Sequence, residues 1–195
     1  MNRCFIVGLT GAVVGLAVCG FALAAEPAEK PQVPKIRVGT YDSRAVAMAH
    51  FGKMIKDGWL ESLYRSHAEA KAAGNDKLVK ELEAEAVSQQ KRFHKQAFGR
   101  APAREAVKTI EKDIAKLAAS AEVDVVVCVH DVAYRSPSAE FLDLTDKMVQ
   151  LFEPDEETLE KIKAVMEHPP LADEVIEHMQ CRPPEKKRDG NARSR

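Results

Sequence analysis

The sequence has few aromatic residues and few cysteines. Aromatic side chains make up 6% of the 195 residues, which is few for a compact core. Of the four cysteines, Cys4 and Cys19 lie within the first 25 residues, so only Cys128 and Cys181 remain beyond them. Two thiols do not form a disulfide framework, and His178 with Cys181 supplies too few ligands for a metal. We therefore expect no disulfide-rich fold and no metal site.

Motifs of familiar catalytic chemistry are also missing. The sequence contains no nucleophile elbow, no phosphate-binding loop and no Ser-x-x-Lys. An enzyme would have to use His130, Asp131 or Asp42, which lie near predicted strand ends, and a turn that caps the strand explains the His130-Asp131 pair better. We predict a protein that is not an enzyme, with no catalytic residues and no cofactor.

The first 25 residues have the pattern of a secretory signal peptide. They combine a basic start, an apolar run and small residues at Ala22, Ala24 and Ala25. A transmembrane helix of similar length is the alternative, but the polar residues that follow at once favour cleavage. Residues 26–34, with three prolines, predict a linker that precedes a single folded domain.

Charge is segregated along the chain although the formal net charge is only −1. Residues 53–116 carry 14 basic and 10 acidic side chains, residues 117–181 carry 4 and 15, and residues 182–195 carry 6 and 2. A solvated face explains many such runs, yet a mildly basic helical region beside an acidic body also suits an acidic or amphipathic partner, or a membrane surface. No basic groove with interleaved aromatics and no zinc-finger spacing is present, so we expect no nucleic-acid partner.

Two stretches are predicted to be strands. Residues 35–42 alternate apolar and polar side chains, which indicates a strand with one buried face. Residues 123–129 contain the continuous apolar run Val125 to Val129, which implies burial on both faces, with Cys128 as a small buried side chain. A small sheet has little to cover such a strand, so we expect other copies of the chain to do so. The candidate oligomer interface consists of Ile36, Val38, Val125, Val127 and Val129.

Two long helices are predicted between these strands. The first begins at Ser43, whose hydroxyl can cap it, and a bend near Asp57 follows from the glycine at position 58. Its apolar stripe consists of Met48, Phe51, Ile55, Trp59 and Leu63. The chain reverses near Gly74, and Asp76 can cap the second helix.

A further helix is predicted after a break at residues 99–102, which contain Gly99 and Pro102. Its heptad seam consists of Ala103, Val107, Ile110, Ile114, Leu117 and Ala121. We expect this seam to pack on the helix that starts at Ser43. The resulting hairpin returns the chain to residues 35–42, so the two predicted strands can pair in one small sheet.

The region after the second strand is predicted to be mainly helical. A short strand at residues 131–136 leads to a helix with Ser136 as cap and Pro137 at its first position, and its inner face consists of Phe141, Thr145, Met148 and Phe152. A shorter helix restarts at Asp155 and ends before Pro169. Residues 153–181 thus form a C-terminal helical extension, and residues 182–195 a basic tail that we expect to be disordered. The predicted fold class is α+β: a small sheet body, an inserted helical hairpin arm and additional C-terminal helices.

Three stretches, "KIRVGTYDSRAV", "VDVVVCVHDVAYRSPSAEF" and "DLTDKMVQLF", give the chain a resemblance to a known family. Together with the order of elements across residues 35–152, they resemble the Skp (OmpH) family of periplasmic chaperones. The resemblance implies a homotrimer whose arms, here residues 44–119 with a reversal near Gly74, enclose unfolded outer-membrane proteins. It implies a periplasmic, ATP-independent holdase that binds clients through Trp59, Leu63, Phe93 and Phe98. A non-catalytic envelope adaptor or structural protein on the same scaffold is the alternative.

Overall fold

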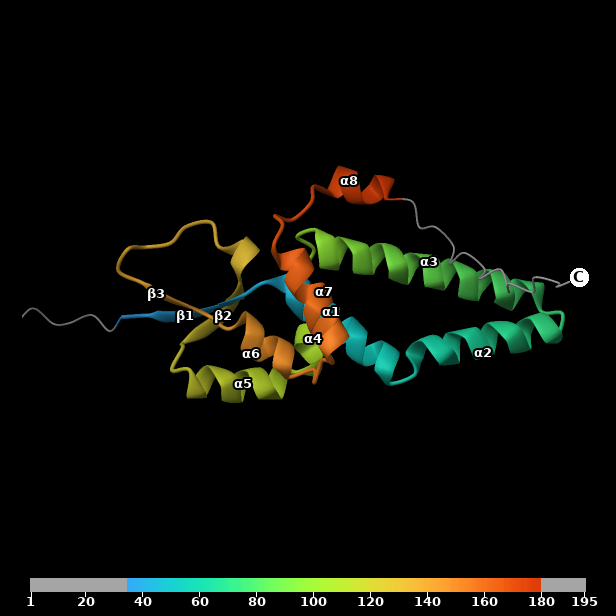
Figure 1. Cartoon of the computed structure of the whole chain (residues 1–195), viewed down its shortest axis with the longest axis horizontal. Coiled ribbons are helices and arrows are strands. Elements are labelled where there is room, and N and C mark those ends of the chain that lie inside the picture. Colours follow the sequence, from blue (N-terminus) through green and yellow to red (C-terminus); the bar gives the residue numbers. More distant parts are fainter. Residues whose placement is uncertain (1–34, 180–195) are drawn as a thin grey trace, which may run out of the picture. The chain divides into compact units, whose positions relative to one another are not determined.

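The computed structural model describes residues 35–179, which form a mixed fold of the predicted α+β class (Figure 1). In this range lie the strands β1 (Arg37–Tyr41), β2 (Val125–Cys128) and β3 (Glu140–Asp143) and the helices α1 (Ser43–Lys56), α2 (Trp59–Ala72), α3 (Asp76–Phe98), α4 (Arg104–Thr109), α5 (Glu111–Ser120), α6 (Thr145–Gln150), α7 (Glu156–Met166) and α8 (Asp173–His178). The predicted signal peptide, linker, Cys181 and basic tail lie outside the described residues. Within residues 35–179, no helix is long and apolar enough to span a membrane.

The sheet is parallel, with β1 between β2 and β3. Val38 is in register with Val125 on one side and with Phe141 on the other. The pairing predicted between the strands at residues 35–42 and 123–129 is therefore confirmed as that of β1 with β2. Since in-register side chains of neighbouring strands point the same way, these three residues lie on one face of the sheet.

The opposite face of the sheet packs on a small core. Gly39 of β1 is in register with Val126 and Leu142. These side chains face the fully buried Leu144, and a Cβ atom added at Gly39 would lie only 2.6 Å from Leu144 Cδ1. This position therefore requires glycine.

The chain from Asp131 to Asp143 differs from the prediction. Residues 129–131 form a 3₁₀ turn, residues 132–136 form no strand, and the helix predicted from Ser136 is wrong. Instead Glu140–Asp143 forms β3, whose first amide donates to Ile36 O at 3.4 Å, and α6 begins only at Thr145. The physical reason is that the second edge of β1 carries unpaired backbone groups, and a strand satisfies them whereas a helix cannot.

Helix α1 forms the centre of the core. Ala45, Val46, Ala47 and Ala49 are each at most 3% exposed, and α1 packs on α3, α4, α6 and α7. Small side chains on several sides of α1 let these helices approach closely. The N-cap of α1 is Asp42, one residue before the predicted Ser43, and its carboxylate accepts a hydrogen bond from Arg44 N at 2.8 Å.

The heptad seam is divided between two helices, so the single helix predicted there is wrong. Thr109 Oγ1 donates to Ala106 O at 2.7 Å, a local bond that competes with the helix ladder, and the helix ends before Ile110. The break turns Ile110 into the core, where it is 6% exposed. The predicted partner is confirmed for α4, because Ala103 and Ala106 pack in the α1 core.

Helices α2 and α3 lie side by side as a hairpin (Figure 1). The predicted reversal is confirmed: Gly74 has a φ of +67°, and Asn75, rather than Asp76, caps α3 through a bond from Leu78 N at 3.1 Å. The predicted bend is also confirmed, since α1 ends before Asp57 and Gly58 has a φ of +85°. The arm predicted at residues 44–119 thus includes α1 and α4, which pack in the core, and α5, whose half-buried Ile114 and Leu117 lie against it. Helix α2 with most of α3 makes up its exposed part.

The two C-terminal helices pack back on the earlier ones. The predicted helix from Asp155 is confirmed as α7, which packs on α1, and Asp155 caps it through a bond from Thr158 N at 2.8 Å. Helix α8 lies against α3 (Figure 1). Residues 153–179 are therefore part of the folded body.

Candidate functional site

An apolar hollow of about 350 Å³ lies between α1, α2 and α3. Its apolar walls consist of Phe51, Met54, Trp59, Leu60, Leu63 and Phe93. Polar side chains also line it, among them His50, Arg92 and Glu105. A second hollow of about 690 Å³ lies between α1, α3 and α7 and is lined by Met48, Ile55, Phe98 and Val165, among others.

A stacked aromatic pair separates the two hollows. Phe51 of α1 and Phe93 of α3 lie with ring centroids 4.0 Å apart and planes inclined by 26°, and both rings line both hollows. Trp59 meets Phe51 edge-on at 6.2 Å. We call these two cavities, with the Phe51–Phe93 pair between them, the twin hollows.

The structure brings the predicted client-binding residues together. Trp59, Leu63 and Phe93 line the first hollow, Phe93 and Phe98 line the second, and all four side chains are half-buried. Phe51 was absent from the predicted contact set although it joins both cavities. The signal that could have identified it was its place on the apolar stripe that includes Trp59 and Leu63.

Charge at the first hollow is balanced. Arg92 and Glu105 form an ion pair on its rim. His50 packs edge-on against Phe152 at 5.6 Å. Burial lowers the pKa of His50, while Glu105 raises it and Arg92 lowers it again. The net effect is a pKa below the ordinary value, so the imidazole is neutral near pH 7.

The predicted oligomer interface is partly exposed. Ile36 is 62% exposed and Val125 is 43% exposed, while Val38 and Val127 are half-buried. Val129 belongs to the 3₁₀ turn instead of β2. Within residues 35–179, nothing pairs with the outer edge of β2. This apolar sheet face therefore remains partly uncovered in a single chain.

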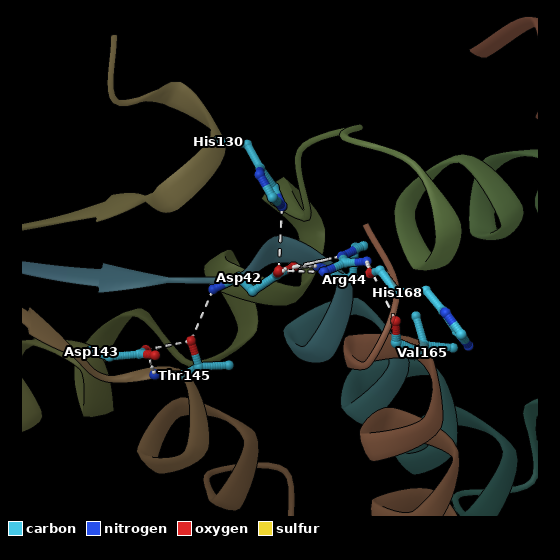
Figure 2. A network of polar contacts seen from close by, with 7 residues as sticks. All are labelled: Asp42, Arg44, His130, Asp143, Thr145, Val165 and His168. Carbon is cyan, nitrogen blue, oxygen red and sulfur yellow. Dashed lines mark hydrogen bonds and ion pairs between the residues drawn. The ribbon is translucent and has the colours of Figure 1, made fainter. Parts of the chain in front are cut away.

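A buried polar cluster lies where β1 ends (Figure 2). The Asp42 carboxylate accepts from Arg44 Nη2 at 2.9 Å and from Arg44 Nε at 3.1 Å, and the two side chains are only 8% and 5% exposed. Arg44 Nη1 also donates to His168 O at 2.8 Å. Thr145 Oγ1 accepts from Asp42 N at 3.0 Å and donates to Asp143 Oδ1 at 2.6 Å. The cluster thus ties β1 to α6 and to the end of α7.

His130 and Asp42, two of the candidate general bases, lie close together in this cluster. His130 Nε2 is 3.3 Å from Asp42 Oδ2 but forms no hydrogen bond with it, while Asp131 is exposed. Burial opposes the charge on Asp42, but hydrogen bonds and the charge of Arg44, aided by His130, hold the pKa of Asp42 below its usual value. Because Arg44 occupies both oxygens, the carboxylate is engaged as a structural partner rather than presented as a proton acceptor.

Comparisons with protein-family models, with curated proteins and with solved structures found no match to this chain. Within residues 35–179, no group of three or more His, Cys, Asp or Glu side chains is arranged to hold a metal. Cys128 is buried as a free thiol, as predicted. The twin hollows and the partly uncovered sheet face are apolar surfaces of the described chain that other molecules can reach.

Proposed function

We propose that the protein is an ATP-independent, non-enzymatic holdase of the periplasm that binds unfolded outer-membrane or other envelope proteins. The observation that carries this proposal is the pair of adjoining apolar hollows with half-exposed aromatic walls. The resemblance of residues 35–152 to the Skp (OmpH) family supports the same role and the periplasmic location. Contact with a membrane surface is compatible with this role, and nucleic acid is not among the proposed partners.

The twin hollows suit transient binding of apolar segments. Burial of apolar surface gives about 25 cal/mol per Å², so a client aromatic side chain that buries about 150 Å² contributes roughly 4 kcal/mol before the entropic costs of binding. Segments that combine several such side chains would be held without nucleotide. Charged groups at the rims, such as Lys56 and Lys161, keep the surroundings hydrated.

Aggregation of a client is the direct test. An outer-membrane β-barrel protein is diluted from urea into the mature chain, residues 26–195, and light scattering is followed without nucleotide. We expect suppression by the parent chain and a clear loss with the double variant Trp59→Ala/Phe93→Ala. Tyr134→Ala is the matched control, because Tyr134 is an aromatic residue that is 76% exposed and lies outside the hollows. Equal suppression by all three chains would refute the proposed client site, provided that circular dichroism shows all three folded.

We also propose that the chain forms a homotrimer through the uncovered sheet face. Ile36, Val38, Val125 and Val127 supply the apolar surface, and other copies would remove it from water. Light scattering after size exclusion should give the mass of three chains, and Val125→Lys should reduce it. Leu78→Lys, at a residue 38% exposed on α3, is the control that should stay trimeric. A monomeric parent chain would refute the trimer.

An envelope adaptor on the same scaffold is the second candidate function. Its support is the packing of α1 and α4 in the core, with α5 against the edge of the core, which leaves only α2 and α3 as a hairpin that is shorter than the predicted arm of residues 44–119. A holdase should suppress aggregation of several unrelated clients. An adaptor should suppress none of them and should instead bind one folded partner, so the same aggregation assay separates the two functions.

A further inference from the structure

The segment after α7 returns to the base of α3. Leu171 N donates to Phe98 O at 2.8 Å, at the last residue of α3. Ile176 of α8 is 4% exposed and lies against Gly99, where an added Cβ atom would be 2.7 Å from Ile176 Cδ1. We call residues 168–179 the strap.

The strap is anchored on two different parts of the fold. At its start, His168 O accepts the 2.8 Å bond from the buried Arg44, which belongs to α1. At its end, Glu177 pairs with Lys95 of α3 at 2.9 Å. The strap therefore joins the beginning of α1 to the end of α3, and through the Leu171 bond it contacts Phe98, which lines the second hollow.

Few apolar contacts hold the strap in place. Ile176 is its one buried apolar residue, whereas Leu171 is 39%, Val175 52% and Met179 37% exposed. The pair of Lys95 and Glu177 is exposed and contributes little. Segments with so few buried contacts open locally at low free energy while the rest of the fold stays intact.

The walls of the twin hollows belong to different helices. Phe51 stands on α1 and Phe93 on α3, so the stacked pair is one of the contacts by which these two helices pack on each other. The α2–α3 hairpin joins the body through the left-handed Gly58 on one side and through the helix break at residues 99–103 on the other. Rotation at these two breaks would move α3 away from α1.

We propose that the strap is a latch that holds α3 against α1, and that its release opens the twin hollows for a larger occupant. That the opened groove receives a client rests on the proposed holdase function. The opening of the hollows on release of the strap does not depend on that function. In the latched state each cavity has room for individual side chains of a client. In the released state Phe51 and Phe93 separate, and the two cavities merge into one groove for a polypeptide segment.

Two substitutions in the same helix test the latch. Ile176→Asp places a charge on the buried side of α8, and Val175→Asp places the same charge on its exposed side. Hydrogen exchange of the amides at residues 93–99 and the fluorescence of the uncharged dye Nile red report the opening. We expect Ile176→Asp to accelerate exchange by roughly tenfold or more and to raise dye fluorescence, with β1 and α1 unchanged. Val175→Asp should match the parent chain in both readouts.

Two results would overturn the latch. One is equal exchange in the Ile176→Asp and Val175→Asp variants, because the strap would then not restrain α3. The other is accelerated exchange throughout β1 and α1, because the strap would then be part of the global core instead of a local device. Client aggregation is measured separately: opening without holdase activity would refute the proposed function and leave the latch standing.

Discussion

Replacement of Arg44 by methionine should destabilise the fold by about 3–5 kcal/mol. The side chains of Asp42 and Arg44 are only 8% and 5% exposed, so the substitution leaves a carboxylate in the core without its counter-charge. The bond from Arg44 to His168 O, which anchors the end of α7, is lost as well. Since domains of this size are stable by about 5–15 kcal/mol, the loss is a large part of the total.

Urea unfolding followed by circular dichroism at pH 7 measures this loss. With a slope of about 2 kcal/mol per molar urea, a loss of about 4 kcal/mol lowers the midpoint by about 2 M. The double variant Arg44→Met/Asp42→Asn is the control, because asparagine carries no charge and can still cap α1. It should be more stable than Arg44→Met alone. The reasoning fails if Arg44→Met costs less than about 1 kcal/mol, or if removal of the Asp42 charge restores nothing.

The free energy of unfolding measured at acidic pH gives an independent check that the Asp42 carboxylate stabilises the fold. Its pKa is lower in the folded chain than in the unfolded one, where it is about 3.9. Its contribution is therefore fully present above that unfolded value and is lost as the pH falls through the folded-state pKa. Asp42→Asn should flatten the part of the curve of unfolding free energy against pH that lies below about pH 4, where the parent chain loses this contribution.

Two further predictions concern Gly39 and His50. Gly39→Ala should cost about 1–3 kcal/mol in urea unfolding, because its Cβ would lie 2.6 Å from the fully buried Leu144, and Leu144→Ala in the same chain should relieve the clash. His50 has a lowered pKa because it is buried, so its neutral form favours the folded state and stability should decline as the pH falls below about 6.5. His50→Gln should remove this part of the decline, and an unchanged midpoint difference between pH 7.5 and pH 5 would contradict the assignment.

Patterns in the sequence identify the elements that depend on local periodicity. Alternation at residues 35–42 and the apolar run near Val125 predict β1 and β2, and Gly58 and Gly74 mark the two changes of helix direction. Apolar residues of the hollows were also recognisable, because Trp59, Leu63 and Phe93 stand on helical stripes. In each case the information lies within one short segment.

Elements that depend on distant partners were not recognisable in this way. Residues 140–143 become β3 because β1 offers a free edge about 100 positions earlier in the chain, and the preceding Ser-Pro-Ser suggested a helix start. The approach of His130 to Asp42 likewise requires the assembled sheet. The central position of α1, in contrast, is indicated locally, because the small residues among Ala45 to Ala49 are typical of a helix that is packed on several sides.

The order of the strands has a consequence for the time course of folding. The central strand β1 is the earliest of the three in the chain, while its partners follow 87 and 103 residues later, as the pairs Arg37–Asp124 and Arg37–Glu140 show. As the chain becomes available for folding from its N-terminus, the hairpin α2–α3 can form from local contacts, whereas β1 stays unpaired until β2 follows and lacks its second partner until β3 follows. The central strand of the finished sheet is thus the first of the three to appear and waits longest for its neighbours, and until then its two unpaired backbone edges are open to pairing with another chain.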